Sequence, residues 1–210
     1  MIKVNAELFR IAYAAVSKEE TRYYLRGVYV EPHPVKGVTL TATDGNQLLC
    51  IHDESGVATE KAIIRLTPDA LKACKIAKRE HARVLTIEDG AKVNATVSVI
   101  EAEGDEAQPR AIIADCKIDG TFPDYRRVIP VPNPLQDSAV NPPHFAGHLI
   151  IAMGDTAIAL KSKIRWHAAD VSSPAIVLFE EAPHVVGVLM PMRSKASPKF
   201  ELPAWYTGEK

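Results

Sequence analysis

The chain has 210 residues, of which 47% are apolar and 24% charged, and its formal net charge is −1 at pH 7. This length is enough for one large domain or two small ones with a real core. The near-zero net charge gives no global signal for nucleic acid or membrane, so any basic surface must be local.

The cysteines and the N-terminal segment indicate the compartment. Cys50, Cys74 and Cys116 are far apart, odd in number and without a Cys-x-x-Cys pair. This argues against a disulfide framework or a thiolate zinc site and fits a reducing cytoplasm. The first sixteen residues contain charged side chains and lack the apolar core of a signal peptide. No run approaches the roughly 18 apolar residues of a membrane span, and we expect a cytoplasmic protein.

The first third of the chain predicts a strand, a helix and further strands. Ile2 and Val4 alternate with polar residues, Asn5 can cap a helix, and apolar residues then recur at helical spacing as far as position 16. Residues 23–31 are rich in Tyr, Leu and Val and predict a strand. Strands are expected at 38–43 and 48–51, joined by the hairpin signal Asp44-Gly45.

The same pattern then starts again. A strand over 62–66 precedes Thr67, which can cap a helix, and Pro68, which suits the first helical position. We expect this helix to run to about Arg79. Strands follow at 84–87, 93–99 and 111–119, with Asp89-Gly90 as a hairpin turn.

A third repeat completes the pattern. A short strand is expected over 137–140, a cap at Asn141 and a helix from Pro142 to about Met153, followed by strands at 157–167, 175–180 and 185–190. Each unit offers a sheet with one apolar face and one helix to cover it. A single unit buries too little surface, so units must pair. The sequence therefore predicts an α+β fold made of three units of helix-backed antiparallel sheet.

The segment 120–130, Gly-Thr-Phe-Pro-Asp-Tyr-Arg-Arg-Val-Ile-Pro, lies between the second and third repeats. Phe122 and Tyr125 supply aromatic bulk, Pro123 stiffens the chain, and Arg126 and Arg127 add two cations. Such a composition predicts a joint that packs on the body of the protein and fixes the part that follows.

Four stretches, in the family's order, resemble the beta sliding clamp of bacterial replicative DNA polymerase. They are 21–28 (TRYYLRGV), 42–48 (ATDGNQL), 120–130 and 188–193 (VLMPMR). The first three look like the family's middle domain and the last like the end of its final domain. The resemblance implies a complete two-unit clamp-like domain over 1–130, a single unit over 131–195 and a C-terminal tail over 196–210. Asn46-Gln47 stand where the family usually has His-Arg, which puts the peptide preference in doubt.

The resemblance also implies a hydrophobic groove that docks short peptides of polymerases and repair proteins. An adaptable methionine lining and an extended apolar peptide would suit each other. The alternative is that these residues are ordinary core at a domain joint. The implied groove residues are Leu25, Thr43, Gly45, Asn46, Gln47, Leu48, Pro123, Arg127, Val128, Asn141, His144, Val188, Met190, Pro191 and Met192.

The second expected helix carries a basic stripe. Lys72, Lys75, Arg79 and Arg83 recur at spacings of three and four, which would place them on one helix face. In the clamp family, helices line the inner wall of a ring and face DNA. Basic side chains without interleaved aromatics suit phosphate contacts without base reading. The alternative is a solvated helix face.

Enzyme and metal functions find little support. His144 and His148 are four residues apart, but no Glu follows His144 in the zincin pattern, and no phosphate-cradling glycine loop or nucleophile elbow is present. We therefore expect no enzyme activity, cofactor or metal. Apolar residues in the tail 200–206 favour packing on their own domain, with docking in a groove as the alternative.

We expect a sliding-clamp-like processivity factor that binds duplex DNA through its phosphates and docks peptides of a polymerase or other partners. A module that only binds peptides, and so acts as a decoy or regulator, is the alternative. The odd number of units predicts self-association through residues 131–195. Family rings contain twelve units, which four copies of a three-unit chain would supply.

Overall fold

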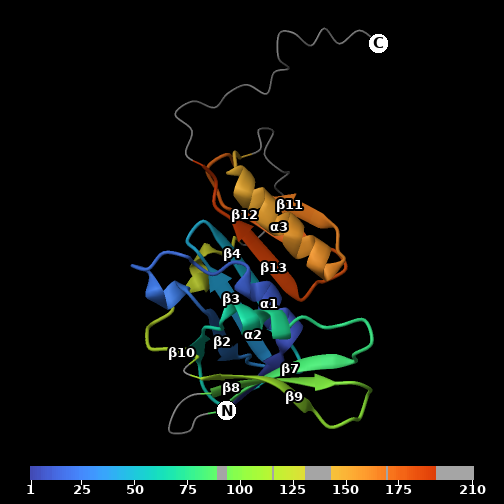
Figure 1. Cartoon of the computed structure of the whole chain (residues 1–210). Helices are drawn as coiled ribbons and strands as arrows, with labels where there is room; N and C mark the ends of the chain where they lie inside the picture. The colour runs from blue at the N-terminus through green and yellow to red at the C-terminus, as the bar shows by residue number, and fades with distance from the viewer. Residues whose placement is uncertain (89–93, 115, 131–142, 169, 193–210) are drawn as a thin grey trace, which may run out of the picture.

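The computed structural model describes residues 1–88, 94–114, 116–130, 143–168 and 170–192. In this part, α-helices pack against antiparallel β-sheets (Figure 1), and the expected α+β class is confirmed. The expected strand at 137–140, the Asp89-Gly90 turn, the Asn141 cap and the tail 196–210 lie outside the described residues.

Two sheets contain the strands. The smaller sheet has the order β5-β1-β7-β8-β9. Its strands are β5 (Val57–Ala58), β1 (Ile2–Asn5), β7 (Ala82–Glu88), β8 (Asn94–Ile100) and β9 (Gln108–Ala114). The larger sheet has the order β10-β6-β2-β3-β4-β13-β12-β11. Its strands are β10 (Lys117–Ile118), β6 (Ala62–Ile64), β2 (Val28–Pro32), β3 (Val38–Thr43), β4 (Gln47–Asp53), β13 (Val185–Leu189), β12 (Ala175–Phe179) and β11 (Ile164–His167).

The larger sheet contains strands from both the N-terminal and the C-terminal part of the chain. β4 pairs with β13 in antiparallel register from Gln47↔Leu189 to Ile51↔Val185. The C-terminal strands β11–β13, orange to red in Figure 1, therefore extend the sheet that the N-terminal residues begin.

Two α-helices begin at the capping residues that the sequence indicates. In α1 (Ala6–Tyr13), the Asn5 side chain accepts hydrogen bonds from the N–H groups of Glu7 and Leu8. In α2 (Pro68–Ala73), Thr67 accepts from the Ala70 N–H, with Pro68 in the first turn. These side chains satisfy backbone donors that a helix start leaves free.

The first two helices belong to units that exchange strands. β2, β3 and β4 follow α1, and β7, β8 and β9 follow α2. β1, which precedes α1, pairs with β7, and β6, which precedes α2, pairs with β2. Each helix-and-three-strand unit is thus completed by the first strand of the other. One buried cluster joins both units, with Phe9, Leu40, Ile64 and Leu85 among its members.

Several boundaries differ from expectation. The strand expected over 23–31 begins only at Val28 as β2, because residues 23–25 form a 3₁₀ turn, η1 (Tyr23–Leu25). The helix expected to reach Arg79 ends at Ala73. The helix expected over 142–153 is instead α3 (Gly147–Leu160), whose N-cap Ala146 makes no side-chain cap, so the strand expected from 157 begins at Ile164. Among the described residues, no helix has the length and apolarity that crossing a membrane requires.

Candidate functional site

The segment Gly120–Pro130 crosses one face of the larger sheet, and we call it the strap. Phe122 stacks on Tyr29 of β2, with ring centroids 4.8 Å apart and planes 2° apart. Tyr125 begins a second 3₁₀ turn, η2 (Tyr125–Val128), and both aromatic side chains are buried. The prediction that this segment packs on the body of the protein is confirmed.

A buried carboxylate fixes the strap. Glu31 of β2 has 3% of its side chain exposed and accepts hydrogen bonds from the Tyr125 hydroxyl (2.6 Å) and from Arg126, whose guanidinium lies 4.7 Å from the centre of the Tyr125 ring. Lys61 adds an ion pair at 3.6 Å. Burial acts to raise the pKa of Glu31, but the hydrogen bonds from Tyr125 and Arg126 outweigh it and hold the pKa below its ordinary value. The sequence reasoning missed Glu31, although a carboxylate among apolar strand residues signals a buried partner.

The predicted groove residues on the sheet lie side by side. Val188 of β13 is directly opposite Leu48 of β4, which in turn is opposite Thr43 of β3. Directly paired residues point to the same face of a sheet. Leu25, Leu48 and Val188 belong to one buried cluster with Ile63, Phe122 and Tyr125. The structure therefore brings Leu25, the sheet residues and the strap together.

The remaining predicted groove residues belong either to the β3–β4 turn or to an exposed border of the buried cluster. Three apolar residues of this border, Val128, Met190 and Met192, are called the margin. Val128, Met190 and Met192 are 42%, 36% and 55% exposed. Pro123, Arg127 and His144 are also exposed, and Pro191 is half-buried. The Met192 N–H donates to the His144 carbonyl at 2.7 Å, which brings His144 beside the methionines. His144 precedes α3 instead of lying on it, and Asn141 lies outside the described residues.

The turn between β3 and β4 closes one end of this region. The Asp44 side chain accepts from the N–H groups of Asn46 (2.8 Å) and Gln47 (3.0 Å), so Asp44 orders backbone. Gly45 has φ +94°, and a Cβ there would lie 2.7 Å from a guanidinium nitrogen of Arg22. The Met190 N–H donates to the Asn46 carbonyl at 2.8 Å, which ties the end of β13 to this turn.

A cavity of about 600 Å³ lies at the start of the strap, between Gly120–Phe122 and strands β6 and β10. Its lining includes the Tyr29–Phe122 stack, and Lys61 and Lys117. None of the predicted groove residues lines it. The sequence pattern contains no signal for this cavity, because β10, β6 and the strap meet there only in the folded chain.

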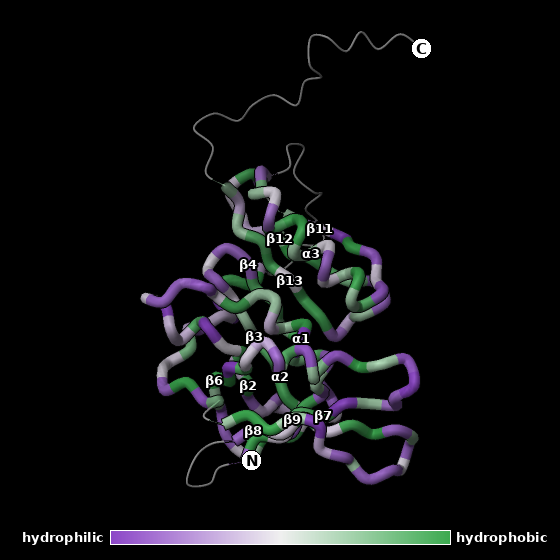
Figure 2. Tube along the Cα trace, in the orientation of Figure 1, coloured by the Kyte–Doolittle hydropathy of each residue, from purple (hydrophilic) through white to green (hydrophobic). Residues whose placement is uncertain are grey.

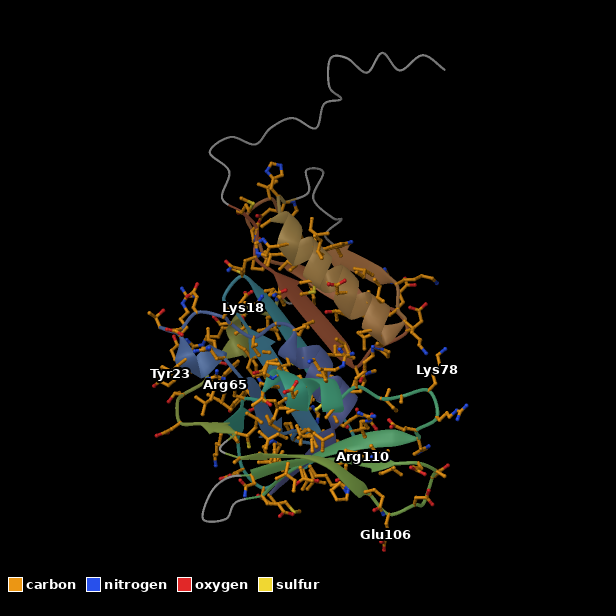
Figure 3. All side chains as sticks on the ribbon, in the orientation of Figure 1. Lys18, Tyr23, Arg65, Lys78, Glu106 and Arg110 are labelled. Carbon is orange, nitrogen blue, oxygen red and sulfur yellow. The ribbon has the colours of Figure 1, made fainter. Side chains whose placement is uncertain are left out.

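The predicted basic stripe does not form a single helix face. Lys72 lies on α2 and forms an ion pair with Asp69 at 3.3 Å. Lys75 and Arg79 follow the helix in an exposed connection to β7, from which Lys78 also projects (Figure 3). Arg83 lies on strand β7, where it was not expected.

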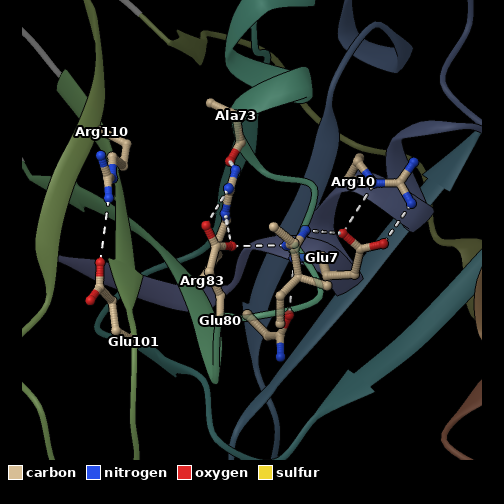
Figure 4. A network of polar contacts seen from close by, with 10 residues as sticks. Glu7, Arg10, Ala73, Glu80, Arg83, Glu101 and Arg110 are labelled. Carbon is tan, nitrogen blue, oxygen red and sulfur yellow. Dashed lines mark hydrogen bonds and ion pairs between the residues drawn. The ribbon is translucent and has the colours of Figure 1, made fainter.

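Contacts with distant residues explain why α2 is short. Arg83 donates to the Ala73 carbonyl and pairs with Glu80 at 2.7 Å, while Glu7 of α1 accepts from the Ile76 N–H at 3.0 Å (Figure 4). These partners satisfy backbone groups that a longer helix would pair internally. Hydrogen bonds from Arg83 and from the Ala77 N–H lower the pKa of Glu80 to about 2. Arg83 therefore serves the local fold.

Within the described part of the chain, no group of three or more His, Cys, Asp or Glu residues is gathered as metal ligands require. His144 and His148 are both exposed.

No protein-family model matches the chain. Among curated proteins, the beta sliding clamp of Caulobacter vibrioides, strain NA1000 / CB15N, is 34% identical over 125 residues, which cover 57% of this chain and 30% of that protein. The match to the protein of the same name from strain ATCC 19089 / CIP 103742 / CB 15 has the same extent.

Solved structures match most of the chain. A DnaN sliding clamp (DNA polymerase III subunit beta) from Bartonella birtlesii, bound to griselimycin, has a TM-score of 0.59 at 20% identity, covering 92% of this chain and 66% of that one. The Caulobacter crescentus beta sliding clamp with bound PEG has a TM-score of 0.60 at 23% identity, with coverage of 92% and 65%. These structures share the fold, and the chain spans slightly less than two thirds of each.

Proposed function

We propose that this chain, a partial relative of the bacterial beta sliding clamp, is a non-catalytic processivity factor. It contacts duplex DNA and docks peptides of a polymerase or repair partner. One observation carries the proposal: side chains of the strap, of β4 and of β13 pack together on one face of a continuous sheet. In this view, residues 1–130 form a two-unit clamp-like domain, 131–195 a single unit and 196–210 a tail.

Peptide docking is assigned to the margin formed by Val128, Met190 and Met192. These side chains are exposed apolar groups. Val128 ends η2, whose Tyr125 shares a buried cluster with Leu48 and Val188, and the two methionines follow β13. The methionine side chain adapts its shape to different apolar partners, and covering a half-exposed methionine with a peptide removes apolar surface from water, which favours binding. The buried cluster below fixes the position of the margin.

The test uses a labelled peptide that copies the clamp-binding segment of the host's replicative polymerase. Fluorescence anisotropy should show saturable binding to the wild-type chain. Met190→Glu with Met192→Glu should weaken it at least tenfold, about 1.4 kcal/mol, because two charges replace the apolar margin. Ile112→Glu, on β9 and 76% exposed, is the control. Equal binding by both variants would contradict the assignment.

DNA contact is assigned to Lys75 and Arg79, with Lys72 beside them. Neither Lys75 nor Arg79 takes part in an ion pair within the described residues, whereas Lys72 pairs with Asp69. Arg83 was predicted for the same role, but its pairing with Glu80 leaves it less available to a phosphate. Phosphate contacts make affinity fall steeply with salt.

Duplex binding measured across a salt series separates the two candidate functions. Lys75→Glu with Arg79→Glu should reduce the slope of log affinity against log salt by about 2 units. Lys36→Glu with Lys163→Glu, both exposed, changes the net charge equally and is the control. A chain that binds the peptide but shows no salt-dependent DNA binding would be a decoy or regulator of clamp-binding proteins instead.

Self-association through residues 131–195 is part of the proposal. The single third unit would find its partner in another chain. A ring of four chains would supply the twelve units of a family ring.

A further inference from the structure

The exposed surface of α3 is mostly apolar. Its 14 residues include one Asp, Asp155, and one His, His148, both exposed, and no Glu, Lys or Arg. Ile150, Ile151 and Ile158 are 44%, 65% and 76% exposed. A helix that faces water normally presents charged and polar side chains there. Figure 2 shows hydrophobic colouring along much of α3.

The same chain shows how such a helix is covered. Every residue of α1 is at least partly buried. α1 contacts β3 and β4 of its own unit and also β7, which follows α2. A second unit therefore closes the side of α1 that its own strands leave open.

Strand edges in the first two units are closed in the same way. β2, the first strand after α1, pairs with β3 along one edge and with β6 along the other. β7, the first strand after α2, pairs with β8 and with β1. In each case the outer edge is filled by the strand that precedes the other unit's helix.

The third helix is followed by three strands in the same order, and within the described residues no second unit covers them. α3 is followed by β11, β12 and β13, and β11 pairs with β12 along one edge only within the described residues. Trp166 of β11 is 42% exposed and stacks with Phe145, with ring centroids 6.3 Å apart. An open edge beside apolar side chains favours association with another chain.

We propose that the α3–β11 surface, formed by Ile150, Ile151, Ile158 and Trp166, docks with the same surface of a second copy. A second copy fits because the partner that closes α1 and β2 is another unit with this element order. Reciprocal strand exchange between units corresponds to a two-fold arrangement, which makes the contact isologous. Gly154 lies between Ile151 and Ile158, and a Cβ there would meet nothing within 4 Å, so a second helix has room to approach.

This inference specifies the surface for the self-association proposed above and rests on it. It does not depend on DNA or peptide binding, because α3 packs on the face of the sheet opposite to the buried cluster that contains Leu48 and Val188. On that face, α3 shares a cluster with Val177 and Leu189, whereas Val188 belongs to the cluster under the strap.

The experiment measures the mass of the full chain by size exclusion with light scattering. We expect an even multiple of the 22.9 kDa chain mass. Ile151→Lys with Ile158→Lys should halve it, whereas Val35→Lys with Ile112→Lys, which are 88% and 76% exposed elsewhere, should not change it. A monomeric wild-type chain, or a double variant with unchanged mass, would overturn the proposal.

Two further readouts keep the result interpretable. Circular dichroism and peptide binding of the Ile151→Lys, Ile158→Lys variant should match wild type, which excludes unfolding as the cause of the lower mass. Hydrogen exchange at β11 should accelerate when the wild-type chain is diluted, because its edge amides lose the second copy. Exchange at β11 that does not depend on concentration would also count against the proposal.

Discussion

Glu31 joins the strap to the larger sheet through one carboxylate. It is almost fully buried, and it accepts hydrogen bonds from the Tyr125 hydroxyl and from Arg126. A buried carboxylate is tolerated only when such partners compensate for lost hydration. The charge of this one side chain therefore helps to hold the strap, together with the buried rings of Phe122 and Tyr125.

Glu31→Gln should lower the free energy of unfolding at pH 7 by about 1.5–3 kcal/mol, because Arg126 loses a charged acceptor. The pKa of Glu31 in the folded chain is below its ordinary value of 4.5. The advantage of wild type over Glu31→Gln should thus be complete above pH 4.5 and shrink as the pH falls further. Urea unfolding of both proteins across pH checks this.

Asp124→Asn is the control for that experiment. Asp124 pairs with Arg127 on the same strap, but both side chains are exposed, so the change should be below about 1 kcal/mol. A difference between wild type and Glu31→Gln that stays constant down to pH 3 would contradict the assigned role.

Gly45 and Gly104 form a matched pair. Their φ angles are +94° and +92°, so alanine should cost about 1–2 kcal/mol at either position. A Cβ at Gly45 would also displace Arg22, whereas one at Gly104 would meet nothing within 4 Å. Urea unfolding should therefore show similar losses of stability for the two variants, and only Gly45→Ala should alter the proposed peptide binding. If Gly45→Ala binds the peptide as wild type does, the β3–β4 turn is not part of the proposed binding surface.

At the scale of elements, local signals located most helices and strands, and long-range contacts set their ends. Asn5 and Thr67 cap helices as the sequence predicts, because capping depends on neighbouring residues only. The end of α2 is set by Arg83 and Glu7, which no local pattern reveals. The start of α3 was misplaced because Asn141-Pro142 resembles a helix start, whereas Ala146 lacks a capping side chain.

For the candidate site, too, local sequence signals predicted one part and long-range contacts set the rest. Leu48 and Val188 lie on adjacent strands, but β4 and β13 are distant in sequence, so only the family resemblance could unite them. Composition alone predicted the packing of the strap. Neither the composition nor the family resemblance predicted that Glu31 holds the strap.

Gly187 of β13 determines how closely α3 approaches the sheet. A Cβ there would lie 3.0 Å from the Met153 sulfur and 3.1 Å from the Val177 Cβ. Gly187→Val should destabilise the chain by about 1–3 kcal/mol through overpacking. Denaturant unfolding followed by Trp166 fluorescence checks this, with Val186→Ile, half-buried on the other face, as the control. Equal stability of the two variants would argue against this contact.

At the scale of the whole molecule, the β4–β13 pairing predicts one cooperative unfolding transition. Trp166 reports on the C-terminal strands once Trp205→Phe removes the second tryptophan. Far-UV circular dichroism reports on the whole chain. The two transitions should coincide, because the strands share one sheet and one core. An earlier transition by fluorescence would show that α3 and β11–β13 melt by themselves.

The distance along the chain between β4 and β13 affects how the protein is made. Roughly 130 residues separate the end of β4 from the start of β13. At ribosomal speeds, β4 therefore waits on the order of ten seconds for its neighbour. During this interval a nascent chain presents an unpaired backbone to other chains on the same message. Slow synthesis or crowded polysomes would thus favour swapped assemblies.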